Sequence, residues 1–157
     1  MKNNSVRIVA LAVGSIALAL TTAAARTSPS ETAAKKPTIT VYKDPGCGCC
    51  KKWIEHLVKN GYRVDAKDTP NMTEIKRTLG VPDALTACHT AVVNGYLIEG
   101  HVSAADIDRL LAEKPRIAGL AVPGMPAGSP GMEGAGTQRY QVLTFDKGGK
   151  TKVFASH

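Results

Sequence analysis

The segment TITVYKDPGCGCCKKWIEHLVKNG, residues 38–61, carries the clearest fold signal in the sequence. A β-prone run over residues 38–42 meets the turn residues Asp-Pro-Gly at 44–46, after which the cysteines open a helix. The apolar positions of that helix recur at helical spacing and form one buried stripe: Cys50, Trp53, Ile54, Leu57 and Val58. Asn60-Gly61 is expected to end the helix, since glycine readily adopts the left-handed conformation found just after helix ends.

A second strand and a second helix are predicted after this helix. Residues 63–66 form a predicted second strand, and a short amphipathic helix is predicted after it, ended by Gly80 and Pro82. The apolar face of this helix consists of Met72, Ile75 and Leu79. Together these segments predict a β-α-β-α unit.

The next segment begins as a β-hairpin. Two β-prone runs, 90–93 and 96–98, flank an Asn-Gly pair at 94–95, which is the strongest short signal for a hairpin. Ser103 is expected to cap a following helix that stops at Pro115. The buried face of that helix consists of Ile107, Leu110 and Leu111. The resulting order, β-α-β-α-β-β-α, is that of the thioredoxin-like α/β fold.

A long loop and a second hairpin are expected after that core. Residues 121–136 are dominated by Gly, Pro, Ala and Met and form a Gly/Pro/Met-rich loop. Two β-prone runs, 140–145 and 152–154, surround the Gly-Gly pair at 148–149 and predict a C-terminal β-hairpin. A loop of this length in a compact domain is usually either functional or disordered.

The first 25 residues have the three parts of a secretory signal peptide. Two basic residues precede an apolar run over 8–20, and Ala23 and Ala25 form the A-x-A pattern that signal peptidase cuts. The run is shorter than the roughly 20 residues that a membrane-spanning helix needs, which favours cleavage over an uncleaved anchor. We expect an exported protein without stable membrane insertion, a flexible leader over 26–36 and one domain over 37–157.

Charge and aromatic content argue against a nucleic-acid partner. The chain has 20 basic and 13 acidic residues, a formal net charge of +7, and removal of the signal peptide leaves 18 minus 13, or +5. Charges of both signs are spread along the chain, and aromatic residues make up 4% of it. A nucleic-acid binder instead gathers basic residues on one element, with aromatic side chains for stacking.

The four cysteines allow three interpretations. In an exported protein an even set forms disulfides by default, which here would be two inert structural bridges. Cys47 and Cys50 also have the C-x-x-C spacing of a redox pair, so a dithiol-disulfide oxidoreductase is the enzymatic alternative. Cys49 adds a third sulfur that dithiol exchange does not need, and this favours a metal site.

The predicted topology brings the cysteines to two of the histidines. A β-α-β crossover makes the first two strands parallel, and the hairpin then runs down and back beside them. The end of the first strand, the start of the third and the end of the fourth share one end of the sheet. These positions hold residues 47–50, Cys88-His89 and His101. His89 faces inward or outward depending on strand alternation, and His101 either ligates metal or bonds within its turn.

The donor atoms gathered there are soft. The helix opened by Cys50 presents free N–H groups and a positive dipole end, which stabilise thiolate, the metal-binding form of cysteine. Three or four thiolates suit Cu(I) or Zn(II), and bridging sulfur permits more than one ion, but the separated Cys/His pairs typical of zinc are absent. Met125 and Met132, in the methionine loop (residues 122–132), add thioether sulfur that selects Cu(I), unless they only pack against the sheet.

Three other residues that could bind metal are interpreted as structural or unordered. His56 lies about two turns below Cys49 on the first helix and is interpreted as solvated surface. Met72 falls on the buried stripe of the second helix and is interpreted as core. His157 is expected to be unstructured.

Three segments resemble one known family. YKDPGCGCCKKW (42–53), ACHTAVVNGYLIEGHV (87–102) and LAVPGMPAGSPGME (120–133) are similar to the motifs of the CopG-type periplasmic copper-resistance proteins. The likeness extends over about residues 36–157. It implies a thioredoxin-like fold, copper bound at the C-x-C-C motif as a multinuclear thiolate-bridged cluster, and a role in copper tolerance through interconversion of Cu(I) and Cu(II).

We therefore interpret the chain as a periplasmic copper-binding protein that contributes to copper resistance. Its expected partners are copper ions and other envelope copper-handling proteins. Thioredoxins proper place a cis-proline at the start of the third strand, where this chain has Cys88-His89-Thr90, so thiol-disulfide exchange is the weaker alternative. A copper oxidoreductase activity is left open. The predicted copper ligands are Cys47, Cys49, Cys50, Cys88, His89, His101, Met125 and Met132.

Overall fold

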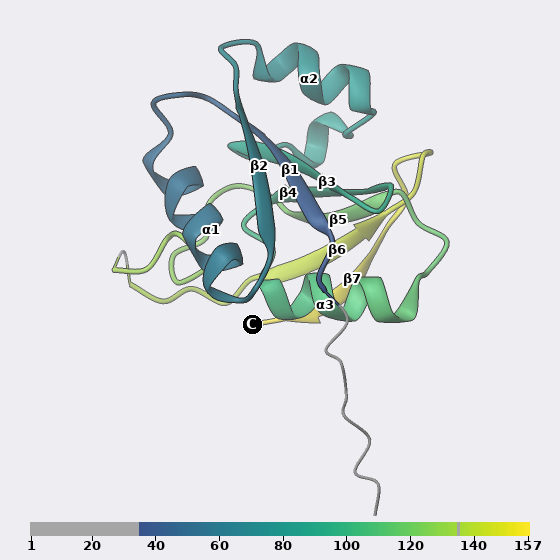
Figure 1. Ribbon diagram of the computed structural model, residues 1–157. Helices are drawn as coiled ribbons and strands as arrows, with labels where there is room; N and C mark the ends of the chain where they lie inside the picture. Colours follow the sequence, from purple (N-terminus) through teal and green to yellow (C-terminus); the bar gives the residue numbers. More distant parts are fainter. Residues whose placement is uncertain (1–34, 135) are drawn as a thin grey trace, which may run out of the picture. The chain divides into compact units, whose positions relative to one another are not determined.

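The computed structural model describes residues 35–134 and 136–157 (Figure 1). The predicted signal peptide, and the predicted leader as far as residue 34, lie outside the described residues. Among the helices that are described, none is long and apolar enough to cross a bilayer. Lys36, assigned to the leader, forms an ion pair with Asp108 at 2.7 Å, so contacts with the domain begin before the predicted start at residue 37.

The described residues form three α-helices and seven strands. Their order is β1 (Thr38–Lys43), α1 (Gly48–Lys59), β2 (Arg63–Asp68), α2 (Met72–Leu79), a 3-10 turn (Asp83–Leu85), β3 (His89–Val93), β4 (Tyr96–Gly100), α3 (Ala104–Glu113), β5 (Gly119–Val122), β6 (Gln141–Phe145) and β7 (Thr151–Ser156). The elements from β1 to α3 confirm the predicted thioredoxin-like order, and β6 with β7 confirms the C-terminal hairpin.

All seven strands belong to one sheet, in the order β2-β1-β3-β4-β5-β6-β7. Strands β1 and β2 are parallel, β3 is antiparallel to both β1 and β4, and β5 returns parallel to β4 after the α3 crossover. Lys43, the last residue of β1, lies opposite His89, the first residue of β3. The chain leaving β1 and the chain entering β3 therefore meet at one end of the sheet, as predicted.

The sheet separates two apolar cores. Helices α1 and α3 contribute Trp53 and Ile107 to the larger core on one face, and α2 lies across the other face (Figure 1). Neighbouring residues of β4 point to opposite faces, since Ile98 belongs to the larger core and Leu97 to the smaller one. This alternation decides which strand residues can reach α1 and which can reach α2.

The turns and helix starts follow from local sequence. Asn94 and Gly95 both have positive φ, 46° and 84°, which is the type I′ geometry expected of an Asn-Gly hairpin. Ser103 Oγ accepts the backbone N–H of Asp106 at 3.1 Å and caps α3 as predicted. Helix α1 begins at Gly48 rather than at Cys50, because the Cys47 side chain takes the cap position and accepts the backbone N–H of Cys50.

Some predicted details were wrong. Residues 119–122 form β5 instead of entering the loop directly; all four are buried, so the strand shows no alternation in sequence. Val58 is 55% exposed because it lies on the solvent side of α1. Met72 is only half-buried, and the buried residue of α2 is Lys76, whose ammonium group bonds to acceptors in the sheet.

His157 is also more ordered than predicted. Its Nε2 lies 2.9 Å from Asp106 Oδ2, and its backbone exchanges two hydrogen bonds with Tyr140. Its ring lies against the Tyr140 ring, with centroids 5.1 Å apart. Pairing of this residue with the chain before β6 explains why it is held in place.

Candidate metal centre

Three chain segments meet at the sheet end defined by Lys43 and His89. Cys47 caps α1 there and two more cysteines lie in its first turn, residue 88 immediately precedes β3, and His101 immediately follows β4. The predicted convergence of these residues is therefore present in the fold.

Four cysteine sulfur atoms lie within 4.8 Å of one another and form what we call the sulfur group: Cys47, Cys49, Cys50 and Cys88. Cys47 and Cys50 are joined by a disulfide, with Cα atoms 5.4 Å apart. Cys49 and Cys88 are free thiols, 3.7 Å apart at Sγ, and Cys49 Sγ lies 3.5 Å from Cys47 Sγ. All four cysteines lie in the described residues, and Cys49 and Cys88 are not joined by a disulfide. The hypothesis of two structural bridges is therefore wrong for this pair.

A second set of donors, the histidine group, consists of Cys88, His89 and His101, again with ligand atoms within 4.8 Å of one another. Cys88 Sγ lies 3.3 Å from His89 Nδ1 and 3.1 Å from His101 Nε2. Cys88 belongs to both groups. Its sulfur is therefore in a position to bridge two metal ions, because a thiolate can donate to more than one.

The tautomer of His101 is fixed by the methionine loop. His101 Nδ1 lies 2.7 Å from the carbonyl oxygen of Pro130. A carbonyl oxygen only accepts, so Nδ1 carries the proton and Nε2, beside Cys88, keeps its lone pair. Such a bond behind a ligating imidazole is the usual way in which proteins orient it for metal. Burial lowers the pKa of His101, while Pro130 and Glu133 act in the opposite direction.

His89 is fully buried between Trp53 and His101, with ring centroids 4.3 Å and 5.1 Å away. Burial, helped by the charges of His101 and Lys76, lowers its pKa to about 3, so the imidazole is neutral at physiological pH. Its Nε2 has no hydrogen-bond partner among the described residues. A buried nitrogen without a partner costs free energy. A neutral imidazole keeps a lone pair, so His89 is one of the residues that could hold a metal ion.

Burial also raises the pKa of the Cys88 thiol to about 12, and the neighbouring Cys49 adds to the shift. Without metal, Cys88 is thus a neutral thiol whose Sγ lies 3.7 Å from that of Cys49. A metal ion that binds there must displace the proton, as cysteine ligation generally requires.

The methionine loop lies beside this centre. Met125 is 54% exposed and its Sδ lies 4.0 Å from Cys49 Sγ. Met132 is half-buried and lines a cavity of about 410 Å³ together with Cys49. The structure therefore brings both methionines to Cys49, and Met125 into direct sulfur contact. Packing of Met125 in the core is excluded by its exposure.

His56 has a role that differs from the predicted solvated surface. Its Nε2 accepts the backbone N–H of Ala104 at 3.0 Å, so the α1 side chain caps the first turn of α3. Burial lowers its pKa, an effect that Glu133 opposes and Lys59 reinforces. Helical spacing placed His56 correctly on α1 but carried no information about α3.

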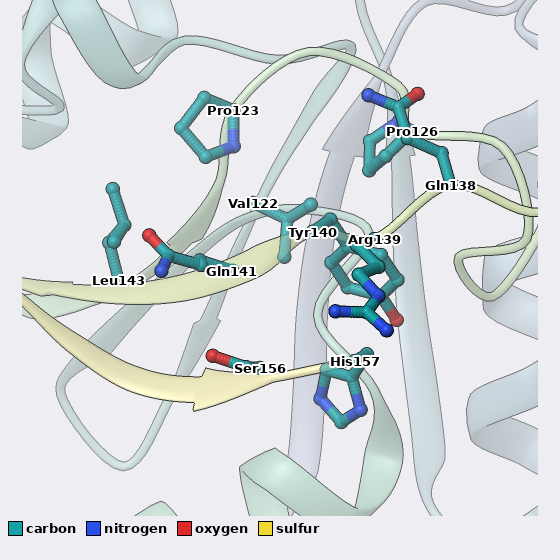
Figure 2. Close-up of a pocket in the computed structure, with 10 residues that line it drawn as sticks. All are labelled: Val122, Pro123, Pro126, Gln138, Arg139, Tyr140, Gln141, Leu143, Ser156 and His157. Atoms are coloured by element: carbon teal, nitrogen blue, oxygen red, sulfur yellow. The ribbon is translucent and has the colours of Figure 1, made fainter.

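A further cavity, of about 660 Å³, lies over the C-terminal hairpin (Figure 2). In this view Arg139 and His157 lie at one side of it and Leu143 at the other. Its lining consists of Val122, Pro123, Pro126, Gln138, Arg139, Tyr140, Gln141, Leu143, Ser156 and His157. None of these side chains belongs to the sulfur or histidine group, so this cavity is separate from the metal centre.

Two residues that bond to the segments around the centre were missed in the sequence. Pro130 acts through its carbonyl oxygen, for which side-chain patterns give no signal. Glu99 did have one: a carboxylate in the middle of the otherwise apolar run YLIEG is rarely buried without a specific partner. It is fully buried, and it accepts the backbone N–H of Ala87, the residue before Cys88.

Comparison with known proteins identifies one family model and two solved structures that are similar to this chain. Residues 85–132 match the family model described as a protein of unknown function, DUF411. No curated protein matches the chain. Two solved structures, forms 1 and 2 of a copper resistance protein CopG, are 46% identical to it over 78% of this chain and 98% of theirs. Their TM-scores are 0.73 and 0.74, respectively, so the similarity includes the fold.

Proposed function

This chain belongs to the copper resistance protein CopG family, and on that premise we propose that it binds copper ions and contributes to copper resistance. The observation that supports this proposal is that cysteine sulfur and imidazole nitrogen atoms form two donor groups, which share Cys88. Thiolate and thioether ligands select Cu(I), and imidazole also suits copper. Met125 next to Cys49 extends the same preference.

We propose that Cu(I) binds as a multinuclear cluster bridged by thiolate. The support is the short separation of the sulfur atoms and the position of Cys88 between the sulfur group and the histidine group. Cys47 and Cys50 can bind copper only in the reduced form, since a disulfide sulfur is a poor donor. Met125, Met132, His89 and His101 complete the proposed ligand set.

Interconversion of Cu(II) and Cu(I) has a balanced form at this site. Two thiolates, those of Cys47 and Cys50, lose one electron each and form the disulfide, while two Cu(II) ions become two Cu(I) ions. The backbone supports this change, because the two Cα atoms lie 5.4 Å apart, within the range that a disulfide spans. An external dithiol would then restore the reduced pair by thiol-disulfide exchange.

The proposed location is the periplasm, after cleavage near Ala25, with other envelope copper-handling proteins as donors or acceptors of the metal. The support is the tripartite pattern of the first 25 residues. Mass analysis of the protein recovered from the periplasm tests it, since a chain that begins at Arg26 is expected.

Titration of the purified, reduced protein with Cu(I) against a competing chelator tests copper binding. We expect at least one copper per chain, lost to a large extent in Cys88→Ser, because this variant removes the shared donor. Met72→Leu, which changes a sulfur-containing side chain outside both donor groups, is the matched control. Fewer than one copper per wild-type chain, or a Cys49→Ser variant that binds as wild type does, contradicts the proposal.

The disulfide favours one alternative, a dithiol-disulfide oxidoreductase that uses Cys47 and Cys50. The two functions differ in their need for metal. The alternative predicts reduction of a model disulfide by the metal-free protein in the presence of a strong copper chelator. Copper binding as the main function predicts no turnover under those conditions.

A further inference from the structure

A buried polar network lies between α2 and the sheet, next to the residue that both donor groups share. Glu99 in β4 is fully buried, and its Oε1 accepts hydrogen bonds from the Lys76 ammonium group and from the backbone N–H of Ala87, the latter at 2.6 Å. Its Oε2 accepts from Thr90 Oγ1 at 2.6 Å. Lys76 also donates to Thr90 Oγ1 at 2.8 Å. Both carboxylate oxygens are therefore bonded.

The network holds a segment that has no secondary structure of its own. Residues 86–88 connect the 3-10 turn to β3 without belonging to a helix or strand. Gly100, next to Glu99, lets this segment approach closely: a Cβ on Gly100 would lie 2.7 Å from Ala87 Cβ. Glu99 and Gly100 thus fix Ala87 against the end of β4, and the next residue along each chain segment is a proposed ligand, Cys88 or His101.

Stability alone does not account for a buried ion pair here. Replacement of such a pair by apolar residues of similar volume is often neutral or stabilising, because desolvation of the charges offsets their attraction. Apolar residues would leave two donors without an acceptor, the Thr90 hydroxyl and the backbone N–H of Ala87. Of the two bonds that Glu99 makes with these donors, the one to Ala87 lies next to a proposed ligand. That bond connects the network to the metal centre.

We propose that Glu99, held in place by Lys76, is a positioning residue for Cys88. It fixes the backbone before Cys88 and thereby sets the 3.1 Å separation between Cys88 Sγ and His101 Nε2. The consequence for copper rests on the proposed function, since a displaced Cys88 weakens both donor groups at once. Changes behind metal ligands typically cost about 10–100-fold in metal affinity, and a loss in that range is expected here.

A matched pair of double variants differs in whether residue 99 keeps a hydrogen-bond acceptor. Lys76→Met with Glu99→Gln removes both charges but leaves an amide oxygen for Ala87 N–H. Lys76→Met with Glu99→Leu removes the charges and the acceptor. Cu(I) affinity, measured by chelator competition, is expected to stay near that of wild type in the Gln variant and to fall about 10–100-fold in the Leu variant. Equal affinities in the two variants overturn the proposal.

Two further measurements separate positioning from general destabilisation. The Leu variant repeated in a Cys88→Ser background is expected to lose no additional affinity, and a loss that persists there contradicts action through Cys88. Amide exchange at Ala87, followed by NMR without copper, is expected to be slow in wild type and the Gln variant and fast in the Leu variant. Unchanged exchange overturns the proposal.

The exchange measurement needs no metal, so its failure is distinguishable from failure of copper binding by the wild type. If the Leu variant does not fold, Glu99→Asp replaces it. That change keeps the charge and the partner Lys76 but withdraws the oxygen from Ala87 by one methylene. Faster Ala87 exchange and weaker Cu(I) binding in Glu99→Asp support the proposal, and wild-type values for both overturn it.

Discussion

His101 donates from Nδ1 to the carbonyl oxygen of Pro130, 2.7 Å away, while its Nε2 lies 3.1 Å from Cys88 Sγ. One imidazole therefore joins the methionine loop to the shared cysteine. Docking of the loop and presentation of the Nε2 lone pair depend on the same hydrogen bond. A change that displaces the loop is expected to disturb the metal centre even if no ligand is replaced.

Gly131→Ala tests this dependence. A Cβ at Gly131 would lie 2.8 Å from Cys49 O and 2.9 Å from Trp53 N, both backbone atoms of α1, so the loop must move away. Gly134→Ala is the matched control, because its φ of 89° is close to the 90° of Gly131 but no described atom lies within 4 Å of the added methyl group.

Both variants are expected to lose about 1–2 kcal/mol of unfolding free energy from the left-handed backbone. Only Gly131→Ala is expected to lose additional stability and to bind Cu(I) more weakly in a chelator competition. Equal copper affinities for the two variants contradict a loop whose position matters to the centre.

Met125→Leu is expected to weaken Cu(I) binding, because it removes the thioether that lies 4.0 Å from Cys49 Sγ. The side chain is exposed and the replacement conserves volume, so the unfolding free energy should change by less than about 1.5 kcal/mol. Met72→Leu makes the same chemical change on α2, outside the centre. Chelator competition on the two variants checks the prediction, and indistinguishable affinities count against Met125 as a ligand.

The two free thiols are expected to differ in reactivity. Cys49 lines an open cavity, whereas the pKa of the Cys88 thiol is raised, mainly by burial, so that this thiol stays protonated at pH 8. Iodoacetamide applied to the metal-free, non-reduced protein should therefore modify Cys49 well before Cys88, as followed by peptide mass mapping. In urea the difference should disappear, and comparable rates in the folded protein contradict a raised pKa of the Cys88 thiol.

Much of this molecule follows from local patterns. The hairpin at Asn94-Gly95 and the cap at Ser103 have chemical signatures of a few residues, and the order of elements then brings Cys88 and His101 to residues 47–50 without further information. The disulfide between Cys47 and Cys50 was one of the alternatives that spacing allowed, but spacing could not select it.

The contributions that were missed come from pairings between distant segments. Lys76 occupies the buried position of α2 because Glu99, 23 residues further along the chain, supplies its partner. His56 caps a helix that begins 48 residues later. Periodicity classifies each of these side chains by its own element, so it assigns charged and polar residues to solvent when the partner lies on another element.

The cap formed by His56 should make stability depend on pH. Its pKa in the folded protein lies below the unfolded value of 6.5, mainly because of burial, so the unfolded chain takes up the proton first. The stabilisation is complete above pH 6.5 and is lost as the pH falls from there toward the folded pKa. The slope for one proton is at most about 1.4 kcal/mol per pH unit, and less here because His56 is only partly buried.

His56→Gln provides the comparison, since the amide oxygen still accepts the Ala104 N–H but does not titrate. Urea unfolding at a series of pH values between 7 and 5 measures the difference. His89 and His101, whose pKa values are also lowered, contribute the same slope to both proteins and cancel. Wild type should therefore lose stability more steeply than His56→Gln as the pH falls. Parallel curves would show that protonation of His56 does not disturb the start of α3.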